Sequence, residues 1–214
     1  MDKQYWESYY ENSNSSNSLK TPSTFAEFCL NEIFSQINSN LFELGCGNGR
    51  DAIFFAHNAQ NVFAIDQCVD SLKVNMQSLD CDLLKNLKPI SGDFVTHDYG
   101  QYDNIDIFYS RFTMHAITLE HELSIIDTVY SNLKSKGIFA IEARTINDPL
   151  YGEGKHISDT TYMTDHKRRF LNPTKFLNHV LNKGFNLKYF LESDNLSVVG
   201  NDNPILMRVI LEKP

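Results

Sequence analysis

A glycine-rich loop between a short apolar segment and a helical segment constrains the fold of this chain most strongly. Leu41–Leu44 has the pattern of a buried strand, Gly45-Cys46-Gly47-Asn48-Gly49 follows it, and residues 52–57 favour a helix. Glycines at such a turn let the backbone reverse sharply and approach a ligand closely. In an α/β sheet this turn lies at the carboxyl ends of the strands, where nucleotide-like ligands bind. The loop therefore predicts an α/β fold with a nucleotide-like ligand.

The rest of the chain continues this alternation of short apolar strands and amphipathic helices. Four further strands are expected at residues 61–66, 87–90, 105–110 and 138–143. Helices are expected between them, the last beginning after Thr118 and ending at Gly137. After a helix that starts at Asn172-Pro173 and stops at Gly184, residues 185–192 and 205–211 form two closing strands. The connection between the closing strands is too short for a crossover helix, so they should pair antiparallel.

This order predicts a single Rossmann-like, doubly wound α/β sheet of about seven strands, mostly parallel with an antiparallel final strand. Residues 41–214 are expected to form one domain with an insertion at about residues 145–171, where the rhythm breaks. Residues 1–40 are expected to form an N-terminal arm and a helix, capped by Thr21 or Thr24.

Composition excludes several classes of protein. The chain has 214 residues and a formal net charge of -8, which argues against binding to the phosphate backbone of nucleic acids. No apolar run reaches the ~18 residues of a membrane span, and the polar start is unlike a signal peptide. The 4 cysteines show no zinc spacing, so no metal is expected. We expect a cytoplasmic protein, either a monomer or a homodimer.

Acidic residues beside the loop indicate which ligand it takes. Asp66 ends the second expected strand and follows Gly45 at a distance that suits a carboxylate accepting both ribose hydroxyls. A dinucleotide fingerprint would place its third glycine where Arg50 stands. Glu43 would also face an anionic pyrophosphate unfavourably, whereas it suits a cationic or amino-bearing ligand. A nicotinamide-dependent dehydrogenase is therefore the weakest alternative.

These residues resemble the class I S-adenosylmethionine-dependent methyltransferases over about residues 40–212. Their first motif, an acid followed by G-x-G-x-G, is similar to Glu43–Gly49. Ala64-Ile65-Asp66 looks like the second motif, Ser91-Gly92-Asp93-Phe94 the third and residues 105–112 the fourth. Within the family, Gly-Asn-Gly-Arg and Tyr-Ser-Arg-Phe are similar to small-molecule members of the tellurite-resistance and phosphonate or phosphate O-methyltransferase kind.

The resemblance implies S-adenosyl-L-methionine as cofactor, S-adenosyl-L-homocysteine as product and no metal. It implies that Glu43 meets the methionine amino group, Asp66 the ribose, and Asp93 and Phe94 the adenine. Trp6, Tyr9, Tyr10 and Ser23 are then candidates for a lid over the cofactor. The full set of expected cofactor-binding residues is Tyr10, Ser23, Glu43, Gly45, Cys46, Gly47, Asn48, Arg50, Asp66, Gln67, Gly92, Asp93, Phe94, Ser110 and Arg111.

Acceptor-side residues are expected after the fourth strand and in the insertion. His115 is the candidate catalytic residue, as a general base or as an orienting donor, although it could equally pin a loop. Residues 144–170 carry one positive charge in excess, in a chain that is acidic overall. The expected acceptor-binding residues are Arg144, Tyr151, His166, Arg168 and Arg169. The alternative for Arg168 and Arg169 is that they pair with local acids and hold the insertion shut.

We therefore expect methyl transfer to an oxygen of a small anionic acceptor of the phosphate or phosphonate type. Such an acceptor is already ionised and needs orientation more than a base. One alternative is O-methylation of a sugar hydroxyl in a surface polysaccharide precursor, with His115 as the base. Another is a non-catalytic module that binds S-adenosylmethionine and acts through a partner protein.

Overall fold

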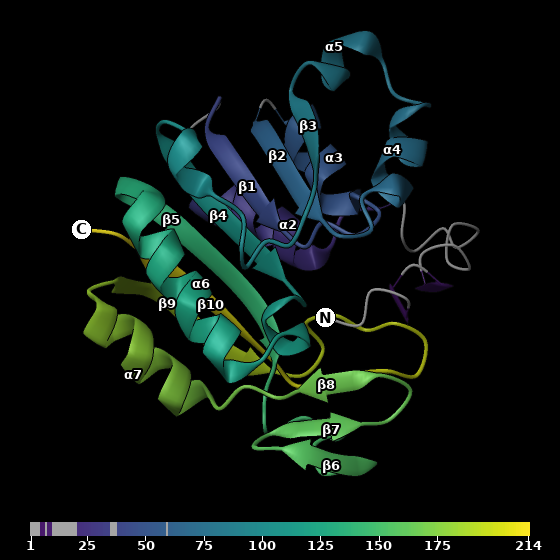
Figure 1. Cartoon of the computed structure of the whole chain (residues 1–214), viewed down its shortest axis with the longest axis vertical. Coiled ribbons are helices and arrows are strands. Elements are labelled where there is room, and N and C mark those ends of the chain that lie inside the picture. Colours follow the sequence, from purple (N-terminus) through teal and green to yellow (C-terminus); the bar gives the residue numbers. More distant parts are fainter. Residues whose placement is uncertain (1–4, 7, 10–20, 35–37, 59) are drawn as a thin grey trace. The chain divides into compact units, whose positions relative to one another are not determined.

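In the computed structural model, which describes residues 5–6, 8–9, 21–34, 38–58 and 60–214, the chain divides into two compact units, residues 2–109 and residues 110–214. The strands follow one another in one seven-stranded sheet in the order β3-β2-β1-β4-β5-β10-β9 (Figure 1). β10 is antiparallel to β5 and to β9, whereas β1, β2, β3 and β4 pair parallel. The predicted fold class is confirmed.

The unit of residues 2–109 alternates strands and helices around the glycine loop. Its elements, including β4, which reaches two residues past the unit boundary, are α2 (Thr24–Phe28), η2 (Cys29–Ile33), β1 (Asn40–Leu44), α3 (Arg50–His57), β2 (Asn61–Asp66), α4 (Asp70–Met76), α5 (Cys81–Leu84), β3 (Leu87–Ser91), η3 (Tyr99–Gln101) and β4 (Ile105–Arg111).

Apolar side chains on both faces of β1 explain why it lies inside the sheet. Leu41, Phe42 and Leu44 are fully buried, and each such side chain contributes roughly 1.5–3 kcal/mol of burial free energy. The Phe42 ring stacks on Phe63 of β2 with 4.7 Å between centroids, directly opposite in the parallel register. A strand buried on both faces needs this near-continuous apolar run. β1 thereby fixes where the glycine loop begins.

The N-cap of helix α2 is neither of the two predicted residues. Ser23 is the N-cap, and its Oγ accepts a hydrogen bond from the backbone N–H of Ala26 at 3.1 Å. The prediction of Thr21 or Thr24 was wrong because Ser23 has a second partner, distant in sequence, that fixes its side chain.

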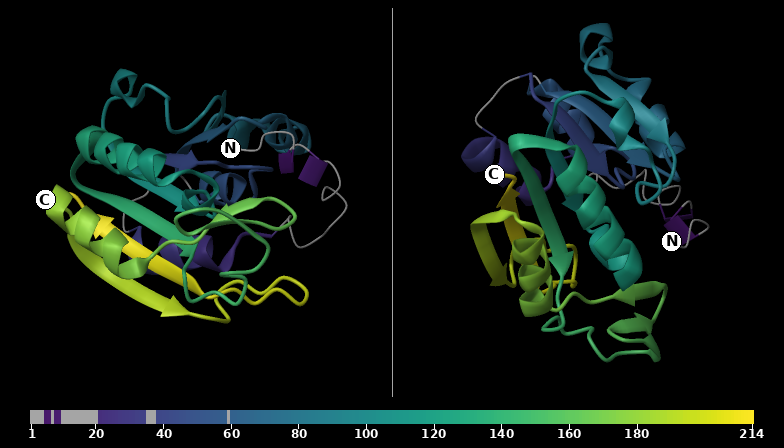
Figure 2. Two further views of the ribbon diagram at one scale, coloured as in Figure 1. Left: turned by 60° about the horizontal axis from the view of Figure 1, so that its bottom comes forward. Right: turned by 60° about the vertical axis from the view of Figure 1, so that its left-hand side comes forward.

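The unit of residues 110–214 holds a long helix, a long strand, a small separate sheet and the closing strands. Its elements are η4 (Met114–Ala116), α6 (Leu119–Asn132), β5 (Leu133–Arg144), β6 (Lys155–Ser158), β7 (Thr161–Met163), β8 (Lys167–Arg169), α7 (Pro173–Lys183), β9 (Asn186–Ser193) and β10 (Leu206–Glu212). β6, β7 and β8 form a three-stranded antiparallel sheet inside the predicted insertion, as Figure 2 shows in green.

Capping residues set the helix ends in this unit, with one correction. Thr118 caps α6, Asn172 caps α7 and Gly184 ends α7 at φ 114°, as predicted. Gly137 does not end α6, because the helix stops at Asn132 and Gly137 lies within β5. The cause is pairing with the end of the chain: the Gly137 carbonyl accepts from the Lys213 N–H at 3.0 Å. A local helix stop was predicted where a distant partner extends the strand.

Candidate functional site

The glycine loop between β1 and α3 has the backbone conformation that its residues predict. Gly45, Gly47 and Gly49 have φ values of 74°, 54° and 80°, in the left-handed region that glycine adopts without strain. A Cβ on Gly49 would lie 2.3 Å from Leu72 Cδ1, so no other residue fits there without displacing α4. The glycine loop therefore packs closely against Leu72 of α4.

Asp66 ties this loop to the end of β2. Its carboxylate accepts hydrogen bonds from the Gly47 N–H at 2.9 Å and from the Cys68 N–H at 2.7 Å. Burial raises the pKa of Asp66, while the N–H groups of Cys68 and Gly47 oppose that rise. An ionised carboxylate accepts about four hydrogen bonds, so Asp66 keeps capacity for ligand hydroxyls.

The loop is a negatively charged environment. Glu43 and Asp66 are both buried, with 5% and 9% of their surface exposed. Burial, then Asp66, then Glu43 raise the pKa of the Cys46 thiol well above its usual value. Two carboxylates that act on one buried thiol suit a ligand bearing a sulfonium or an ammonium. This charge balance is what a cationic cofactor requires and what a pyrophosphate would not tolerate.

Asp93, one of the two residues predicted to meet the adenine, follows β3 and contacts Gln67 after β2. Asp93 accepts from Gln67 Nε2 at 2.7 Å and from the Val95 N–H at 2.9 Å, and the Gly92 N–H donates to the Asp66 carbonyl at 3.0 Å. The structure therefore brings Gln67, Gly92 and Asp93 to the same edge as Asp66. Phe94 is placed differently: its ring is only 1% exposed and belongs to the core of this unit.

A buried carboxylate that the sequence analysis did not select connects α2 to the start of α3. Asp51 accepts from the Ser23 N–H and the Ser23 Oγ, both at 2.7 Å, and from the Tyr109 hydroxyl at 2.8 Å. The Phe25 ring stacks on Tyr109 at 5.3 Å between centroids. Asp51 is the second residue of α3, an acidic first-turn position that could have been noticed in the sequence.

The remaining predicted cofactor residues are accounted for as follows. Asn48 is buried, and its Oδ1 lies 3.4 Å from the Arg50 N–H that donates to it. Trp6 and Tyr9 have helical backbone and contact edge-to-face at 5.6 Å between centroids. Tyr10 lies outside the described residues. Within its own unit, Ser110 is fully buried and hydrogen-bonds through Oγ to the Thr113 hydroxyl.

Arg111 and the residues around it form a buried ionic cluster in the unit of residues 110–214. Glu142 is fully buried and accepts from Arg111 Nε at 3.0 Å and from Arg208 Nε at 2.7 Å. Arg111 also donates to Ser197 Oγ, and Arg208 donates to the Leu196 carbonyl. Glu142 therefore neutralises one of two guanidinium charges and holds the β9–β10 connection to the sheet.

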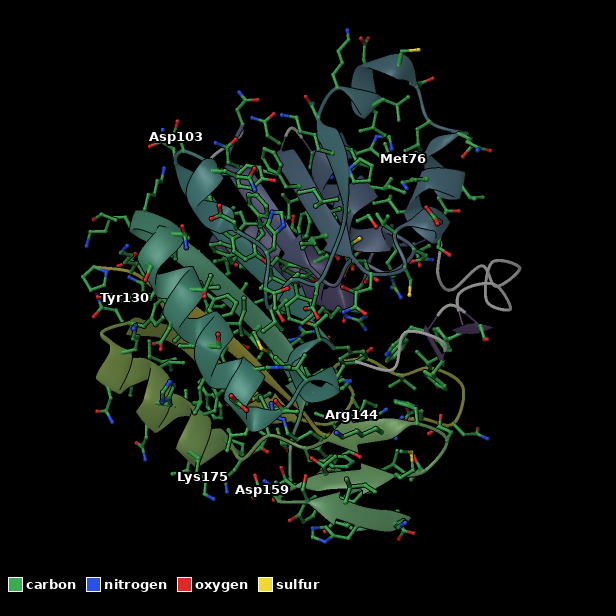
Figure 3. All side chains as sticks on the ribbon, viewed as in Figure 1. Met76, Asp103, Tyr130, Arg144, Asp159 and Lys175 are labelled. Carbon is green, nitrogen blue, oxygen red and sulfur yellow. The ribbon has the colours of Figure 1, made fainter. Side chains whose placement is uncertain are left out.

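Each of the three predicted acceptor-side arginines already has a carboxylate partner. Arg144, labelled at the end of β5 in Figure 3, pairs with Asp148 at 3.0 Å and with Asp202. Arg168 lies 3.7 Å from Asp165. Arg169 pairs with Glu122 and donates to the carbonyls of Met114 and Ile117, both at 2.8 Å.

The contacts of Arg169 favour the interpretation that this residue holds the insertion in place over the interpretation that it binds the acceptor. Its guanidinium is 95% buried in contacts to η4, α6 and the segment between them, so it fastens β8 to the His115 segment. Arg168 lies in the same strand with 11% of its side chain exposed, and its contacts include Asp165 at 3.7 Å and the Thr164 hydroxyl at 3.2 Å. Because its ion pair is longer than that of Arg169, Arg168 is the candidate of the two for an acceptor contact.

His115 lies in the short η4 helix and is 4% exposed. Its Nδ1 is buried and has no hydrogen-bond partner within the described part of the chain. Burial lowers the pKa of His115 well below its usual value, and the cationic Arg144, Arg168 and Arg169, with His166, lower it further. The imidazole is therefore neutral at physiological pH and lies in a positive potential.

His166 and Tyr151 complete the predicted acceptor set. His166 is buried, and burial followed by Arg168 lowers its pKa, while Asp165 at 3.1 Å opposes that shift. Tyr151 is 38% exposed and contacts Tyr162 and Phe170 edge-to-face, at 5.4 and 5.6 Å between ring centroids. Its ring therefore offers an accessible aromatic face on the insertion.

The described part of the chain contains neither a candidate metal centre nor a candidate membrane-spanning helix. Within the described ranges, no three His, Cys, Asp or Glu side chains gather closely enough to hold a metal ion. None of the helices described here is long and apolar enough to cross a membrane.

Comparison with known proteins identifies the class. The profile of the family described as "Methyltransferase domain" matches residues 35–195. The chain therefore belongs to that family and is a methyltransferase, which confirms the predicted enzyme class. No curated protein sequence matches the chain.

Several solved methyltransferases share the fold at low sequence identity. One is the Burkholderia thailandensis 1,6-didemethyltoxoflavin-N1-methyltransferase, solved with 1,6-didemethyltoxoflavin and S-adenosylhomocysteine; it has a TM-score of 0.71, 12% identity, and coverage of 98% of this chain and 88% of its own. The CcbJ methyltransferase from Streptomyces caelestis has a TM-score of 0.71 at 13% identity, covering 90% of each chain. The glycopeptide N-methyltransferase MtfA, solved with S-adenosylmethionine, has a TM-score of 0.68 at 14% identity, covering 91% of this chain and 95% of its own.

Proposed function

We propose that this chain transfers a methyl group from S-adenosylmethionine to an oxygen of a small anionic acceptor, of the phosphate or phosphonate type. The observation that carries the proposal is the glycine loop of residues 2–109 with its buried carboxylates Glu43 and Asp66. The unit of residues 110–214, taken by itself, holds a buried histidine beside arginines. The similar solved structures include complexes with S-adenosylmethionine and with its demethylated product, which supports the choice of cofactor.

Each proposed cofactor-binding carboxylate would meet a different part of S-adenosylmethionine. Glu43, with Asp66 close by, would stabilise the positive charge of the methionine end, since both carboxylates act on the loop at Cys46. Asp66 would accept the ribose hydroxyls with its remaining lone pairs. Asp93 would accept the adenine amino group. The arm of residues 1–40 would close over this ligand, with Ser23 and Asp51 fixing its root.

S-adenosylmethionine supplies a methyl group on a positively charged sulfur. As the acceptor oxygen attacks this carbon in line, the new C–O bond forms while the C–S bond breaks, and the electron pair returns to sulfur. A phosphate or phosphonate oxygen carries its negative charge before attack, so no residue has to remove a proton. Orientation and exclusion of water then account for most of the acceleration.

Cationic groups around His115 would supply that orientation. Burial comes first among the causes that lower the pKa of His115, and Arg144, Arg168 and Arg169 add to it, so these guanidinium groups would set the charge around an anionic acceptor there. Arg144 and Arg169 are fixed by their carboxylate partners and would act as stationary charges, whereas Arg168 has the weaker partner and would contact the acceptor. Tyr151 would add a hydroxyl donor. The resemblance to the tellurite-resistance and phosphonate O-methyltransferase kind agrees with such an acceptor.

Neutral His115 also favours a second candidate, the methylation of an uncharged hydroxyl such as that of a sugar. An unprotonated imidazole can accept the proton that a hydroxyl loses during attack. The two candidates differ in their pH dependence, because an uncharged acceptor makes the rate fall as His115 becomes protonated, whereas an ionised acceptor does not require the imidazole as a base.

Release of S-adenosylhomocysteine, screened over phosphates, phosphonates, phosphorylated sugars, neutral sugars and carboxylates, tests the proposal. Turnover confined to phosphorus oxyacids is expected, with mass spectrometry placing the methyl group on oxygen. Turnover on neutral hydroxyls alone would replace the first candidate by the second. Tight cofactor binding without turnover on any class would leave a non-catalytic binding module.

The variant Asp66→Ala tests the proposed cofactor site without requiring that the acceptor be known. Loss of two charge-assisted hydrogen bonds and the ribose contacts should weaken S-adenosylhomocysteine binding by about a hundredfold. Isothermal titration calorimetry measures this affinity, with Asp103→Ala as a control because Asp103 is exposed and is not among the predicted cofactor residues. Unchanged affinity in Asp66→Ala would remove Asp66 from the cofactor site.

A further inference from the structure

One face of the small sheet in the insertion combines aromatic side chains with a cation. β6, β7 and β8 lie side by side (Figure 1), and their register places His156, Tyr162 and Arg168 directly opposite one another across the three strands. Residues that pair directly across antiparallel strands point to the same face, and the rings of His156 and Tyr162 do meet, at 5.1 Å between centroids. Arg169 points to the opposite face, where it donates to the Met114 carbonyl of η4. We call the face of His156, Tyr162 and Arg168 the aromatic face.

Two further rings extend the aromatic face. Tyr162 lies 5.4 Å from Tyr151 and 6.3 Å from Phe170 between ring centroids, and Tyr151 lies 5.6 Å from Phe170, all in edge-to-face contact. Phe170 is fully buried, so its contacts anchor both tyrosine rings to the core of this unit. Tyr151 is exposed and Tyr162 is half-buried. The two tyrosines therefore present rings that are fixed in position and partly accessible.

Arg168 places a positive charge beside these rings, since it lies directly opposite Tyr162 in the strand register. A guanidinium group has five N–H donors in a planar fork, which suits the oxygens of a phosphate or phosphonate. The strand that carries Arg168 is joined to the segment of His115, because Arg169 donates to carbonyls on both sides of that histidine. The aromatic face is thus connected to the candidate acceptor residue of the same unit.

Resting on the proposed function, we infer that the acceptor carries an aromatic ring next to its anionic group, with the ring on Tyr151 and Tyr162 and the anion on Arg168. A flat ring packs on tyrosine rings in an offset or edge-to-face arrangement, which adds up to about tenfold to affinity beyond the effect of the apolar area buried. An aliphatic acceptor of the same charge would engage Arg168 without this gain. The acceptor class is therefore an aryl phosphate or aryl phosphonate.

The reaction on such an acceptor balances without a further reactant. A phosphonate oxygen forms the new C–O bond to the methyl carbon while the C–S bond of S-adenosylmethionine breaks and its electron pair stays on sulfur. The products are the monomethyl ester of the aryl phosphonate and S-adenosylhomocysteine.

A matched set of acceptors tests the inference, because phenylphosphonate, cyclohexylphosphonate and methylphosphonate share the anionic group and differ in the substituent. Initial rates of S-adenosylhomocysteine release should give phenylphosphonate a kcat/KM at least about tenfold higher than that of methylphosphonate. Cyclohexylphosphonate, which is similar in size but not flat, should fall well below phenylphosphonate. Equal kcat/KM for the phenyl compound and either of the others overturns the inference and leaves the proposed function in place.

Failure of the proposed function gives a different result, namely that none of the three phosphonates is methylated. The inference is then decided by calorimetric affinities of the three compounds for the chain saturated with S-adenosylhomocysteine. The same tenfold preference for phenylphosphonate supports the aromatic face as a ring-binding site, and equal affinities overturn it.

Variants of the tyrosines separate ring binding from anion binding. Tyr162→Leu should reduce the preference for phenylphosphonate to about threefold or less, whereas Tyr162→Phe keeps the ring and the preference. Arg168→Ala should weaken all three phosphonates alike. Tyr189→Leu is the matched control, because it makes the same change on β9, outside this small sheet, and should leave the preference unchanged.

Tyr151→Leu provides an independent variant on the aromatic face, and it should also reduce the preference. Circular dichroism establishes that each variant is folded. A full preference for phenylphosphonate in folded Tyr162→Leu and Tyr151→Leu would place the ring elsewhere and overturn the inference.

Discussion

The two units of the molecule satisfy their buried charges in different ways. In residues 2–109, the buried or half-buried carboxylates of Asp51, Asp66 and Asp93 accept hydrogen bonds chiefly from backbone N–H, hydroxyl and amide groups. In residues 110–214, buried carboxylates face guanidinium groups, with Glu142 between two arginines and Glu122 against Arg169. The first arrangement combines contacts between near neighbours with contacts between residues up to 58 positions apart. The second joins residues that are 31 to 66 positions apart in the chain.

This difference bears on what each unit can bind. Carboxylates held by neutral donors keep their negative charge for a ligand, which suits a cationic cofactor. Guanidinium groups flank the buried carboxylates of the second unit, and after burial itself the charges of Arg144, Arg168 and Arg169 lower the pKa of His115. It also bears on stability, because a charge whose partner is removed is costly to leave buried.

The largest effect is expected from breaking the ionic cluster of the second unit. Glu142→Ala leaves Arg111 and Arg208 without their shared carboxylate in a buried position, and should lower the free energy of unfolding by about 3–5 kcal/mol. Urea denaturation followed by circular dichroism measures the change. Glu142→Gln keeps the shape and one acceptor and should lose less. Equal stability of wild type and Glu142→Ala would show that the cluster contributes nothing to this unit.

A smaller effect is expected from the neutral-donor network of the first unit. Ser23→Ala removes the Oγ donor to Asp51 and the N-cap of α2, while the backbone N–H of residue 23 still reaches Asp51. The expected loss is about 1–3 kcal/mol, measured by the same denaturation. Tyr109→Phe is the matched control, since it removes a single donor to Asp51 and should cost about 1 kcal/mol. Should Ser23→Ala cost as much as Glu142→Ala, the contrast between the two units would be lost.

The sequence predicted most of the fold because the relevant signals are local. Periodic apolar residues located the strands of the first unit, and Thr118, Asn172 and Gly184 marked helix ends through groups within one turn. The two failures have a common cause. Gly137 lies in β5 because Lys213 pairs with it, and Ser23 caps α2 while it is also held by Asp51. Both depend on contacts with residues that are distant in the chain.

In the candidate site, too, residues with a local sequence signal could be predicted, whereas contacts between distant residues could not. The loop and Asp66 could be predicted because glycines with positive φ and a strand-end carboxylate leave a pattern in the sequence. The partner of Arg169 could not, because nothing in its neighbourhood indicates Glu122 or the carbonyls of η4. Asp51 was overlooked for a different reason: an acid in the first turn of a helix is common, and its role becomes visible only through Ser23 and Tyr109.

A change in pH should reveal the burial of His115, whose effect on the pKa the neighbouring arginines increase. Because the pKa of folded His115 lies well below its unfolded value, the unfolded chain binds more protons as pH falls through about 6.5, and stability must fall with it. Between pH 6.5 and 5.5 this one histidine should account for about 1 kcal/mol. Unfolding of wild type and His115→Gln, compared at both pH values, isolates the contribution. His166 and His97, whose pKa values are also lowered, remain in both proteins, so an identical pH dependence would contradict the assignment to His115.

The smallest effect on stability, and the most specific one on function, is expected at Arg168. Its ion pair with Asp165 is long, and 11% of its side chain is exposed, so Arg168→Ala should lower the free energy of unfolding by up to about 1 kcal/mol. If Arg168 grips the acceptor, KM for an anionic acceptor should rise about tenfold or more while the affinity for S-adenosylhomocysteine stays the same. Lys167→Ala is the matched control, because it removes an exposed cation from the same strand. Initial-rate kinetics and calorimetry separate the two quantities, and equal weakening of acceptor and cofactor would make Arg168 a structural residue, like its neighbour Arg169.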